Sequence, residues 1–260
     1  MKILKIPCSC GALRKKAGIE KAPDAICKEL ENFYLKENGL LPILDIDEVK
    51  IENSNIEAAN KSIQKKIKEL NIPAIVIGGD HSITYSCFKS FANNFNNPGL
   101  VVFDAHADCE NDFRPPTHED YLRVLVQEGI LKSENIILIG IRNLHINELE
   151  FVKKNKIKYY SMKELTENGR QDNAEAIMSV ARKFDALYIS VDIDVVDPAF
   201  APGTGYVEPG GMSSRELIFL LHKLRLLRNF RMMDIVEVNP DKDISNLTVK
   251  LAAKLVVEMS

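Results

Sequence analysis

The chain has 260 residues, of which 45% are hydrophobic and 27% are charged, and its formal charge at pH 7 is -3. These values are ordinary for a globular protein. Its 34 Lys and Arg residues are balanced by 37 Asp and Glu residues. The basic residues form scattered pairs such as Lys15-Lys16 and Lys65-Lys66, which we interpret as solvated helix faces. The charge pattern therefore argues against a nucleic-acid partner.

The cysteine pattern and the lack of long apolar segments favour a reducing, cytoplasmic setting. The five cysteines are odd in number and contain no CxxC pair, so a disulfide framework or a zinc ribbon is not expected. The N-terminal apolar run is broken and too short for a signal peptide, and no segment approaches the roughly 20 apolar residues that span a bilayer. We therefore expect a cytoplasmic protein with no membrane partner.

Apolar runs and helical segments alternate along the chain. Runs rich in Ile, Val and Leu lie at residues 1–6, 40–46, 74–79, 100–104, 136–141, 157–160, 186–193 and 231–238. Most are continuously apolar, as expected of strands covered on both faces. Segments with helical periodicity lie at 22–36, 56–70, 121–129, 172–184, 214–227 and 244–259.

This alternation predicts a single α/β domain over residues 1–260, with three layers (α/β/α) and a mainly parallel sheet of about eight strands. We interpret "DIDE" at 45–48 as a loop without a role. The segment 197–211 lacks periodicity, and such a long loop in a compact domain usually serves a functional site.

Polar clusters directly follow several of the apolar runs. They are "IVIGGDHS" at 75–82, "VVFDAHAD" at 101–108, "YISVDIDVVDP" at 188–198 and "MDIVEVNP" at 233–240. Parallel sheets bind ligands beyond the carboxyl ends of their strands. We therefore expect these clusters to lie at one edge of the sheet.

The second cluster carries Asp104, His106 and Asp108 on alternate positions. Burying such groups unpaired would cost several kcal/mol, and a bound cation would compensate them. Asp192 and Asp194 are also two apart and would share one face while the chain is extended. Two carboxylates so close repel each other unless a positive charge intervenes. The alternative is an exposed Asp pair at the start of a loop.

His81 follows Gly78-Gly79-Asp80, where the glycines permit a tight turn into a helix beginning near Ser82. The alternative is a histidine that merely starts this helix. A phosphate site has weak support, because GxxxxGK[ST] and GxGxxG are both absent.

Taken together, the clusters offer two histidines and at least four aspartates, which suit two divalent ions. Carboxylates with imidazoles and no thiolate favour Mn²⁺ over a structural zinc. Two ions about 3.5–4 Å apart would lower the pKa of a bridging water and supply hydroxide. The pattern therefore predicts a binuclear hydrolytic centre.

At this point the sequence resembles the arginase/agmatinase (ureohydrolase) family. The resemblance lies in "GGDHS" at 78–82, "DAHAD" at 104–108, "SVDIDVVDPAFAPGTG" at 190–205 and "DIVEVNP" at 234–240, in the family's order. The segment "IPCSCGALRKKAGIEKAPDAI" at 6–26 also resembles the family's opening loop and first helix. The resemblance covers nearly the whole chain and implies the arginase-like fold and two Mn²⁺ per subunit.

The resemblance also implies how the ligands are shared. One Mn²⁺ would be held by His81, Asp104, Asp108 and Asp192, and the other by Asp104, His106, Asp192 and Asp194, so that Asp104 and Asp192 bridge. Glu237 would pair with the substrate guanidinium, which fits two-pronged recognition of a planar cation by a carboxylate. The alternative for Glu237 is a buried acid with an internal partner.

The family's proton-shuttling histidine matches His118 best. Here the sequence departs from the family pattern, because agmatinases usually continue His-Gly, whereas this chain has His118-Glu119-Asp120. The alternative is that residues 117–120 start a helix, with Thr117 as N-cap and Asp120 in a capping-box-like position. We interpret His145 and His222, in helical segments outside the clusters, as structural or solvent-facing.

The implied reaction is hydrolysis of a guanidino C–N bond by metal-bound hydroxide, with agmatine giving putrescine and urea as the leading case. The loop at 109–117 lacks the Asn and Ser positions with which arginases hold an amino acid's α-carboxylate and α-amine, which favours agmatine, a decarboxylated arginine. Four acids nearby favour a cationic tail, namely Glu110, Asp112, Glu119 and Asp120, whereas Arg114 argues the other way.

Other substrates and another class of function stay open. Arginine, guanidinobutyrate or formiminoglutamate would use the same metal centre. The protein could also be a non-catalytic metal-binding or scaffold member of the fold, although all six candidate ligands are present. The resemblance further implies a homo-oligomer, a trimer or a hexamer.

Overall fold

One sheet runs through the molecule, with its strands in the order β2-β1-β3-β8-β7-β4-β5-β6 and every neighbouring pair parallel. The computed structural model describes residues 1–13 and 18–260. The Lys15-Lys16 pair and part of the N-terminal motif lie outside the described residues, so their interpretation stays a prediction. The strands are β1 (Lys2–Lys5), β2 (Asp45–Glu48), β3 (Ala74–Ile77), β4 (Pro98–Phe103), β5 (Ile136–Ile141), β6 (Lys158–Ser161), β7 (Ala186–Asp192) and β8 (Phe230–Val236).

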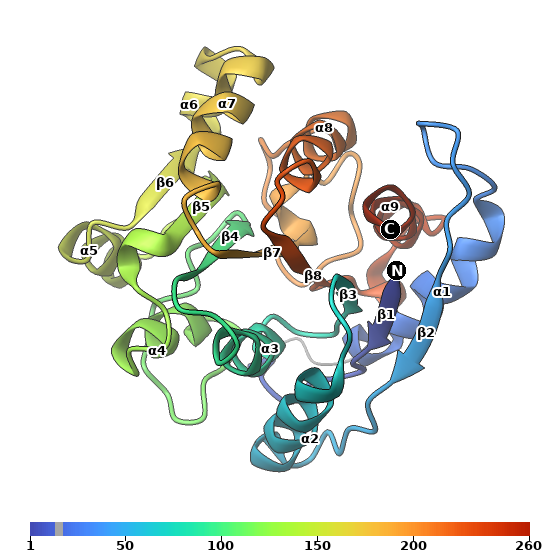
Figure 1. Cartoon of the computed structure of the whole chain (residues 1–260), viewed down its shortest axis with the longest axis horizontal. Coiled ribbons are helices and arrows are strands. Elements are labelled where there is room, and N and C mark those ends of the chain that lie inside the picture. Colours follow the sequence, from blue (N-terminus) through green and yellow to red (C-terminus); the bar gives the residue numbers. More distant parts are fainter. Residues whose placement is uncertain (14–17) are drawn as a thin grey trace.

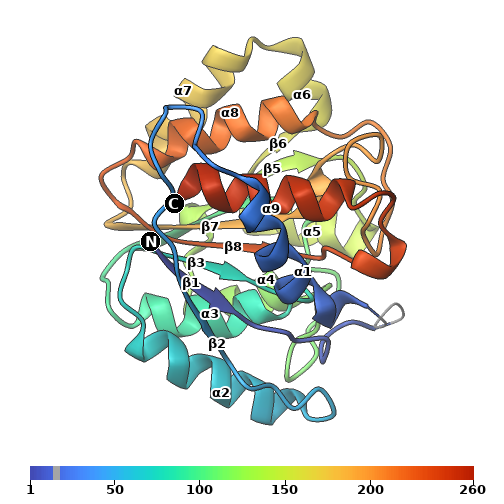
Figure 2. The ribbon, with the colours of Figure 1, turned by 90° about the vertical axis from the view of Figure 1, so that its right-hand side faces the viewer.

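Helices cover both faces of this sheet, which Figure 1 shows nearly edge-on. The helices are α1 (Ala22–Glu29), α2 (Ile56–Glu69), α3 (Ile83–Ala92), α4 (Tyr121–Gln127), α5 (Ile146–Lys154), α6 (Met162–Glu167), α7 (Arg170–Ala181), α8 (Ser214–Arg225) and α9 (Leu247–Met259). Helices α1, α7, α8 and α9 lie on one face, and α2, α3, α4 and α5 lie on the other (Figures 1 and 2). This arrangement confirms the predicted single-domain α/β/α fold.

The continuously apolar strands are explained by two cores, one on each face. In β4, Val101 and Phe103 pack into the core beneath α7, α8 and α9, whereas Leu100 and Val102 pack into the core beneath α3 and α4. Successive side chains of a strand point to opposite faces, so both sets must be apolar when both faces are covered. Each large side chain buried in this way contributes about 1.5–3 kcal/mol.

Strand register brings the polar clusters to one end of the sheet. In the β4–β7 pair, Phe103 lies beside Val191, so Asp104 and Asp192 follow at adjacent positions. Strand β3 pairs with β8, whose neighbour on the other side is β7. The chain segments that leave β3, β8, β7 and β4 therefore emerge side by side, as the parallel sheet predicted.

Several sequence-based boundaries were wrong. The "DIDE" segment is not a loop but the edge strand β2, paired with β1. Its acids are neutralised by lysines of neighbouring elements, as in the 2.7 Å pair of Lys2 with Asp45. The first helix ends at Glu29, and a 3₁₀ turn (Leu30–Asn32) replaces its expected continuation to residue 36. Within the part of the chain that the structure describes, no helix is long and apolar enough to span a bilayer.

Candidate metal centre and adjoining cavity

The predicted ligands lie where strands end and the chain turns. Asp104 directly follows β4, Asp192 is the last residue of β7, and Asp194 lies in the following 3₁₀ turn (Ile193–Val195). His81 lies between β3 and α3. A Cβ atom at Gly79 would lie 1.8 Å from the backbone oxygen of Cys8, so this turn requires glycine.

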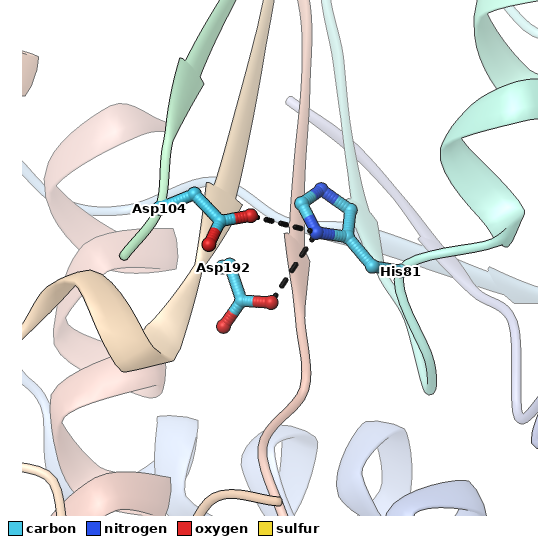
Figure 3. A group of neighbouring side chains, drawn as sticks. All are labelled: His81, Asp104 and Asp192. Carbon is cyan, nitrogen blue, oxygen red and sulfur yellow. Dashed lines mark ion pairs between the residues drawn. The ribbon is translucent and has the colours of Figure 1, made fainter. Parts of the chain in front are cut away.

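A first group of ligand atoms surrounds His81, as Figure 3 shows in part. Its Nδ1 lies 3.2 Å from Asp104 Oδ2 and 3.2 Å from Asp192 Oδ2. Asp108 Oδ2 lies closer, at 2.8 Å. Asp108 has a backbone φ of 49°, an uncommon conformation for a residue with a side chain. In this conformation its carboxylate lies next to His81 Nδ1. The structure thus brings together the four residues predicted for one ion.

A second group surrounds His106. Its Nδ1 lies 3.4 Å from Asp104 Oδ1 and 3.1 Å from Asp194 Oδ2. Asp104 therefore presents one oxygen to each group. Asp192 presents Oδ2 to His81, while its Oδ1 accepts the backbone N–H of Asp194 at 2.8 Å. Its predicted role in the second ion site stays a prediction.

The two groups concentrate negative charge in a buried place. Burial and the nearby Asp194 and Asp104 carboxylates raise the pKa of Asp192 well above its usual value. Burial and Asp104 likewise raise the pKa of Asp108 to about 8. Carboxylates that repel each other in a low-dielectric environment are stabilised when a cation binds between them.

The donor set fits divalent cations. The Nδ1 of His81 and the Oδ2 of Asp104 are buried and close to each other, yet neither makes a hydrogen bond with a described residue. Each group combines one imidazole with carboxylates. The ligand atoms of His81, Asp104 and Asp192 lie within 4.8 Å of one another, as do those of Asp104, His106 and Asp194. Oxygen-rich sets with imidazole and no thiolate suit Mn²⁺ and similar ions. A cation bound between these two buried atoms would supply the interaction that no hydrogen bond provides.

A chain of hydrogen bonds that the sequence analysis missed contacts His81 at Nε2, the ring nitrogen that does not face the acids. Its Nε2 lies 2.8 Å from Ser190 Oγ, which donates to Asp234 Oδ1 at 2.6 Å. Asp234 is buried and also accepts from Tyr188 and Thr84. With Nε2 engaged, Nδ1 is the nitrogen that faces the acids. A polar residue inside an apolar strand was the available signal for both Ser190 and Asp234.

The predicted strand at 231–238 included Glu237. In the structure β8 ends at Val236, so Glu237 is the first residue after the strand. Its φ is 62°, in the left-handed region that residues with a side chain rarely adopt. Its backbone N–H donates to the Gly79 oxygen at 2.8 Å, and its Oε1 accepts the backbone N–H of His81 at 2.8 Å. Such strain commonly accompanies functional positions. Here it directs a buried carboxylate toward His118, whose Nδ1 lies 3.3 Å from Oε1.

His118 is buried beside this carboxylate. Burial alone would lower its pKa, but the hydrogen bond and charge of Glu237 raise it to about 9. The backbone N–H of Leu13 faces Nε2 at 3.3 Å, a contact that suits the neutral ring. Both observations place a proton on Nδ1, which faces Glu237. They differ on Nε2, because a pKa of about 9 adds a second proton there at neutral pH, whereas the Leu13 contact requires Nε2 as an acceptor.

The alternative interpretation of residues 117–120 as a helix start holds in part. Helix α4 begins only at Tyr121, so Thr117 is not its N-cap. The capping-box-like contact is present, because the carboxylate of Asp120 accepts the backbone N–H of Thr117 at 2.6 Å, and it also accepts the Thr117 hydroxyl and the backbone N–H of Phe113. These bonds form a turn that presents His118 on one side. The structural and functional interpretations of this segment are compatible.

A cavity of about 310 Å³ adjoins the two groups. Six of the eight predicted site residues line it: His106, Asp108, His118, Asp192, Asp194 and Glu237. His81 and Asp104 are almost fully buried next to it. Of the four acids predicted to favour a cationic tail, Glu110 and Glu119 line the cavity, whereas Asp112 and Asp120 do not. Arg114, which was predicted to favour a carboxylate tail, is not a lining residue either.

Tyr206 is a cavity residue that the sequence analysis missed. It lies in the loop at 197–211, which was predicted to be functional, and its hydroxyl donates to Glu119 Oε1 at 2.8 Å. Its ring centroid lies 5.6 Å from that of His106 and 6.0 Å from that of His118. No motif singled it out, because its contacts come from segments distant in the sequence.

The remaining histidines have structural contacts. His145 is the N-cap of α5 and accepts from the backbone N–H of Asn147, as a structural residue would, but it also lines the cavity. His222, in α8, pairs with Glu258 of α9 at 2.9 Å.

Comparison with known proteins agrees with this geometry. The arginase family profile matches residues 1–260. The chain belongs to the arginase family. It is 31% identical to an arginase of Staphylococcus aureus over 277 residues, covering 94% of this chain and 91% of the relative. It is 34% identical to a formimidoylglutamase of Halalkalibacterium halodurans over 259 residues, covering 93% and 80%.

A solved structure extends the likeness to three dimensions. The formimidoylglutamase of Bacillus subtilis superposes with a TM-score of 0.92 at 27% identity, covering 99% of this chain and 84% of that chain. The ureohydrolase resemblance is therefore confirmed, and this arginase-family protein is placed among hydrolases. The preference for agmatine stays a prediction.

Proposed function

We propose that this arginase-family protein hydrolyses a guanidino C–N bond at a binuclear Mn²⁺ centre, with agmatine as the first candidate substrate and putrescine and urea as products. One observation carries the proposal. Asp104 presents one oxygen to each of two His–carboxylate groups, and these groups adjoin a cavity that also contains the carboxylate of Glu237.

The ions would be held as the family resemblance implies. One set is His81, Asp104, Asp108 and Asp192, and the other is Asp104, His106, Asp192 and Asp194. When bound, two such ions lower the pKa of coordinated water and act as Lewis acids toward the substrate. The role of the protein is to fix the positions of the ligands, as the Ser190 hydroxyl does for His81.

Glu237 would orient the guanidinium group. Its Oε1 is anchored by the backbone N–H of His81, so the carboxylate has a defined direction. A carboxylate matches the planar guanidinium with two parallel hydrogen bonds. Such a clamp holds the guanidinium carbon at a constant position next to the metal groups, which lowers the entropic part of the barrier.

His118 would donate a proton to the leaving amine. Hydrolysis adds water across the C–N bond, so the oxygen remains with urea and the amine nitrogen takes a proton. The raised pKa of His118, about 9, keeps a proton available at neutral pH. Its Nδ1 lies 3.3 Å from Glu237 Oε1, so the proton donor is adjacent to the group that orients the substrate.

Arginine and formiminoglutamate are the second candidates, because relatives that match most of the chain are named arginase and formimidoylglutamase. Guanidinobutyrate would use the same centre. The test is turnover of the Mn²⁺-loaded protein with these four compounds, measured as urea from the guanidino substrates and as glutamate from formiminoglutamate. Highest kcat/KM for agmatine supports the proposal. No turnover with any of them, in protein that binds Mn²⁺, would point to the non-catalytic alternative.

We also propose that the protein is a cytoplasmic homo-oligomer, a trimer or a hexamer. This rests on the family resemblance and on the lack of a helix, among the described residues, that could span a membrane. Light scattering of the purified protein measures the assembly mass directly, and a monomer would contradict the proposal.

A further inference from the structure

We infer that Glu119 and Glu110, with Tyr206, form a wall of the cavity that selects guanidino substrates whose far end is positively charged. The inference rests on the proposed function, because it concerns the part of the substrate that does not react. It assigns to these residues the discrimination between an ammonium and a carboxylate tail.

Glu110 and Glu119 are placed together by the backbone. The backbone N–H of Glu110 donates to the oxygen of Glu119 at 3.0 Å, so the two residues lie side by side although nine positions apart. Both line the cavity that contains Glu237 and His118. Their side chains are 32% and 27% exposed, so each carboxylate is partly shielded from water and still accessible to a ligand.

Tyr206 holds one of these carboxylates in place. Its hydroxyl donates to Glu119 Oε1, which lies 3.7 Å from His118 Nε2. The ring of Tyr206 lies beside the rings of His106 and His118, and these contacts restrain it. A carboxylate next to an aromatic ring is a favourable environment for an alkylammonium group, by charge attraction and by cation–π contact.

The other charged groups of this loop point elsewhere. Asp120 is buried and accepts from Thr117 and Phe113. Arg114, the residue that could have favoured a carboxylate tail, donates to Gln127 Oε1 at 2.6 Å and lies 4.0 Å from Glu128. Among the described residues no Lys or Arg lines the cavity.

Histidine nitrogens lie near these two carboxylates: His118 Nε2 lies 3.7 Å from Glu119 Oε1, and His145 Nδ1 lies 3.7 Å from Glu110 Oε1. Both distances exceed a hydrogen bond, so each carboxylate keeps room for a ligand. An ammonium tail is attracted by these two carboxylates, and a carboxylate tail is repelled.

The experiment compares three substrates that share a guanidino group and differ in the charge of the tail: agmatine, 4-guanidinobutanoate and the neutral butylguanidine. Each is measured with the Mn²⁺-loaded wild type and with Glu119→Gln, Glu110→Gln and Tyr206→Phe. Asp112→Asn is the matched control, because it removes one negative charge from the same loop at an exposed residue outside the cavity lining.

We expect each Gln variant to lower kcat/KM for agmatine by about fivefold and to raise it for 4-guanidinobutanoate, since an exposed charge pair contributes up to about 1 kcal/mol. Butylguanidine should change little. Tyr206→Phe keeps the ring and should raise KM for agmatine more than it lowers kcat. The control should leave the ratio of the charged substrates unchanged.

Equal changes for all three substrates, or no change in either Gln variant, would overturn the inference. Calorimetric titration of the same compounds makes the result independent of turnover. If the wild type turned over none of them, the proposed function would fail. The inference about the cavity wall would still be supported if Glu119→Gln weakened the binding of agmatine and Asp112→Asn did not.

Discussion

Ser190 Oγ lies 2.8 Å from His81 Nε2, the ring nitrogen that does not face the acidic groups. We predict that Ser190→Ala lowers Mn²⁺ affinity about 10–100-fold, because loss of an outer partner frees the ring and its tautomer. Titration of the metal-free protein with Mn²⁺ measures this affinity. Ser179→Ala, which removes an exposed hydroxyl from α7, is the control. Equal affinity in both variants would show that Ser190 does not orient the ligand.

The second prediction concerns the shared ligands. Asp104→Ala and Asp192→Ala should each abolish activity and tight binding of both metals, because a bridging carboxylate serves two ions. Asp194→Ala, which would serve one ion, should retain part of the metal. Metal content per subunit decides the matter. Near-wild-type content in either of the first two variants would refute the bridging assignment.

His118→Asn should keep both metals and lower kcat by about 10²–10⁴-fold, the usual loss for an acid–base group. The turn that carries residue 118 should survive, because Asp120 anchors it through Thr117 and Phe113. Steady-state kinetics and metal analysis of the same preparation test this. An unchanged rate would leave His118 with a purely structural role.

Glu237→Gln preserves shape but removes the charge and one of two acceptors for a guanidinium. We predict that kcat/KM falls for every guanidino substrate by roughly 10²-fold, equivalent to about 2.7 kcal/mol, with manganese content unchanged. The amide oxygen can still accept the backbone N–H of His81, so the local fold should persist. Intact kcat/KM with altered thermal stability would instead identify Glu237 as a structural acid.

Metal removal should destabilise the folded protein. The carboxylates of the two groups repel each other without a cation, as the raised pKa of Asp192 indicates. A ligand at 100 times its Kd stabilises the native state by about 2.7 kcal/mol, so chelation should lower the Tm and renewed Mn²⁺ should restore it. Asp104→Ala provides the comparison, since its Tm should respond little to chelator. A Tm of the wild type that chelator leaves unchanged would contradict this view.

Much of the fold follows from local sequence. Residues of β4 are apolar at every position because alternate side chains pack into two different cores, one on each face of the sheet. This pattern alone indicated a parallel sheet covered on both faces. The alternate spacing of Asp104, His106 and Asp108 likewise predicted a metal site from the sequence alone. Parallel strands end at the same edge, so the meeting of Asp104 with Asp192 was predictable once the strands were assigned.

Only the tertiary structure decided which polar residues of the loops face the cavity. Glu119 and Asp120 are adjacent acids, yet one lines the cavity and the other is buried against the backbone of its own turn. Tyr206 reaches Glu119 from a loop 87 positions away. A loop side chain is oriented by whichever distant donors or acceptors its backbone brings within hydrogen-bonding range, and neither periodicity nor spacing encodes these partners.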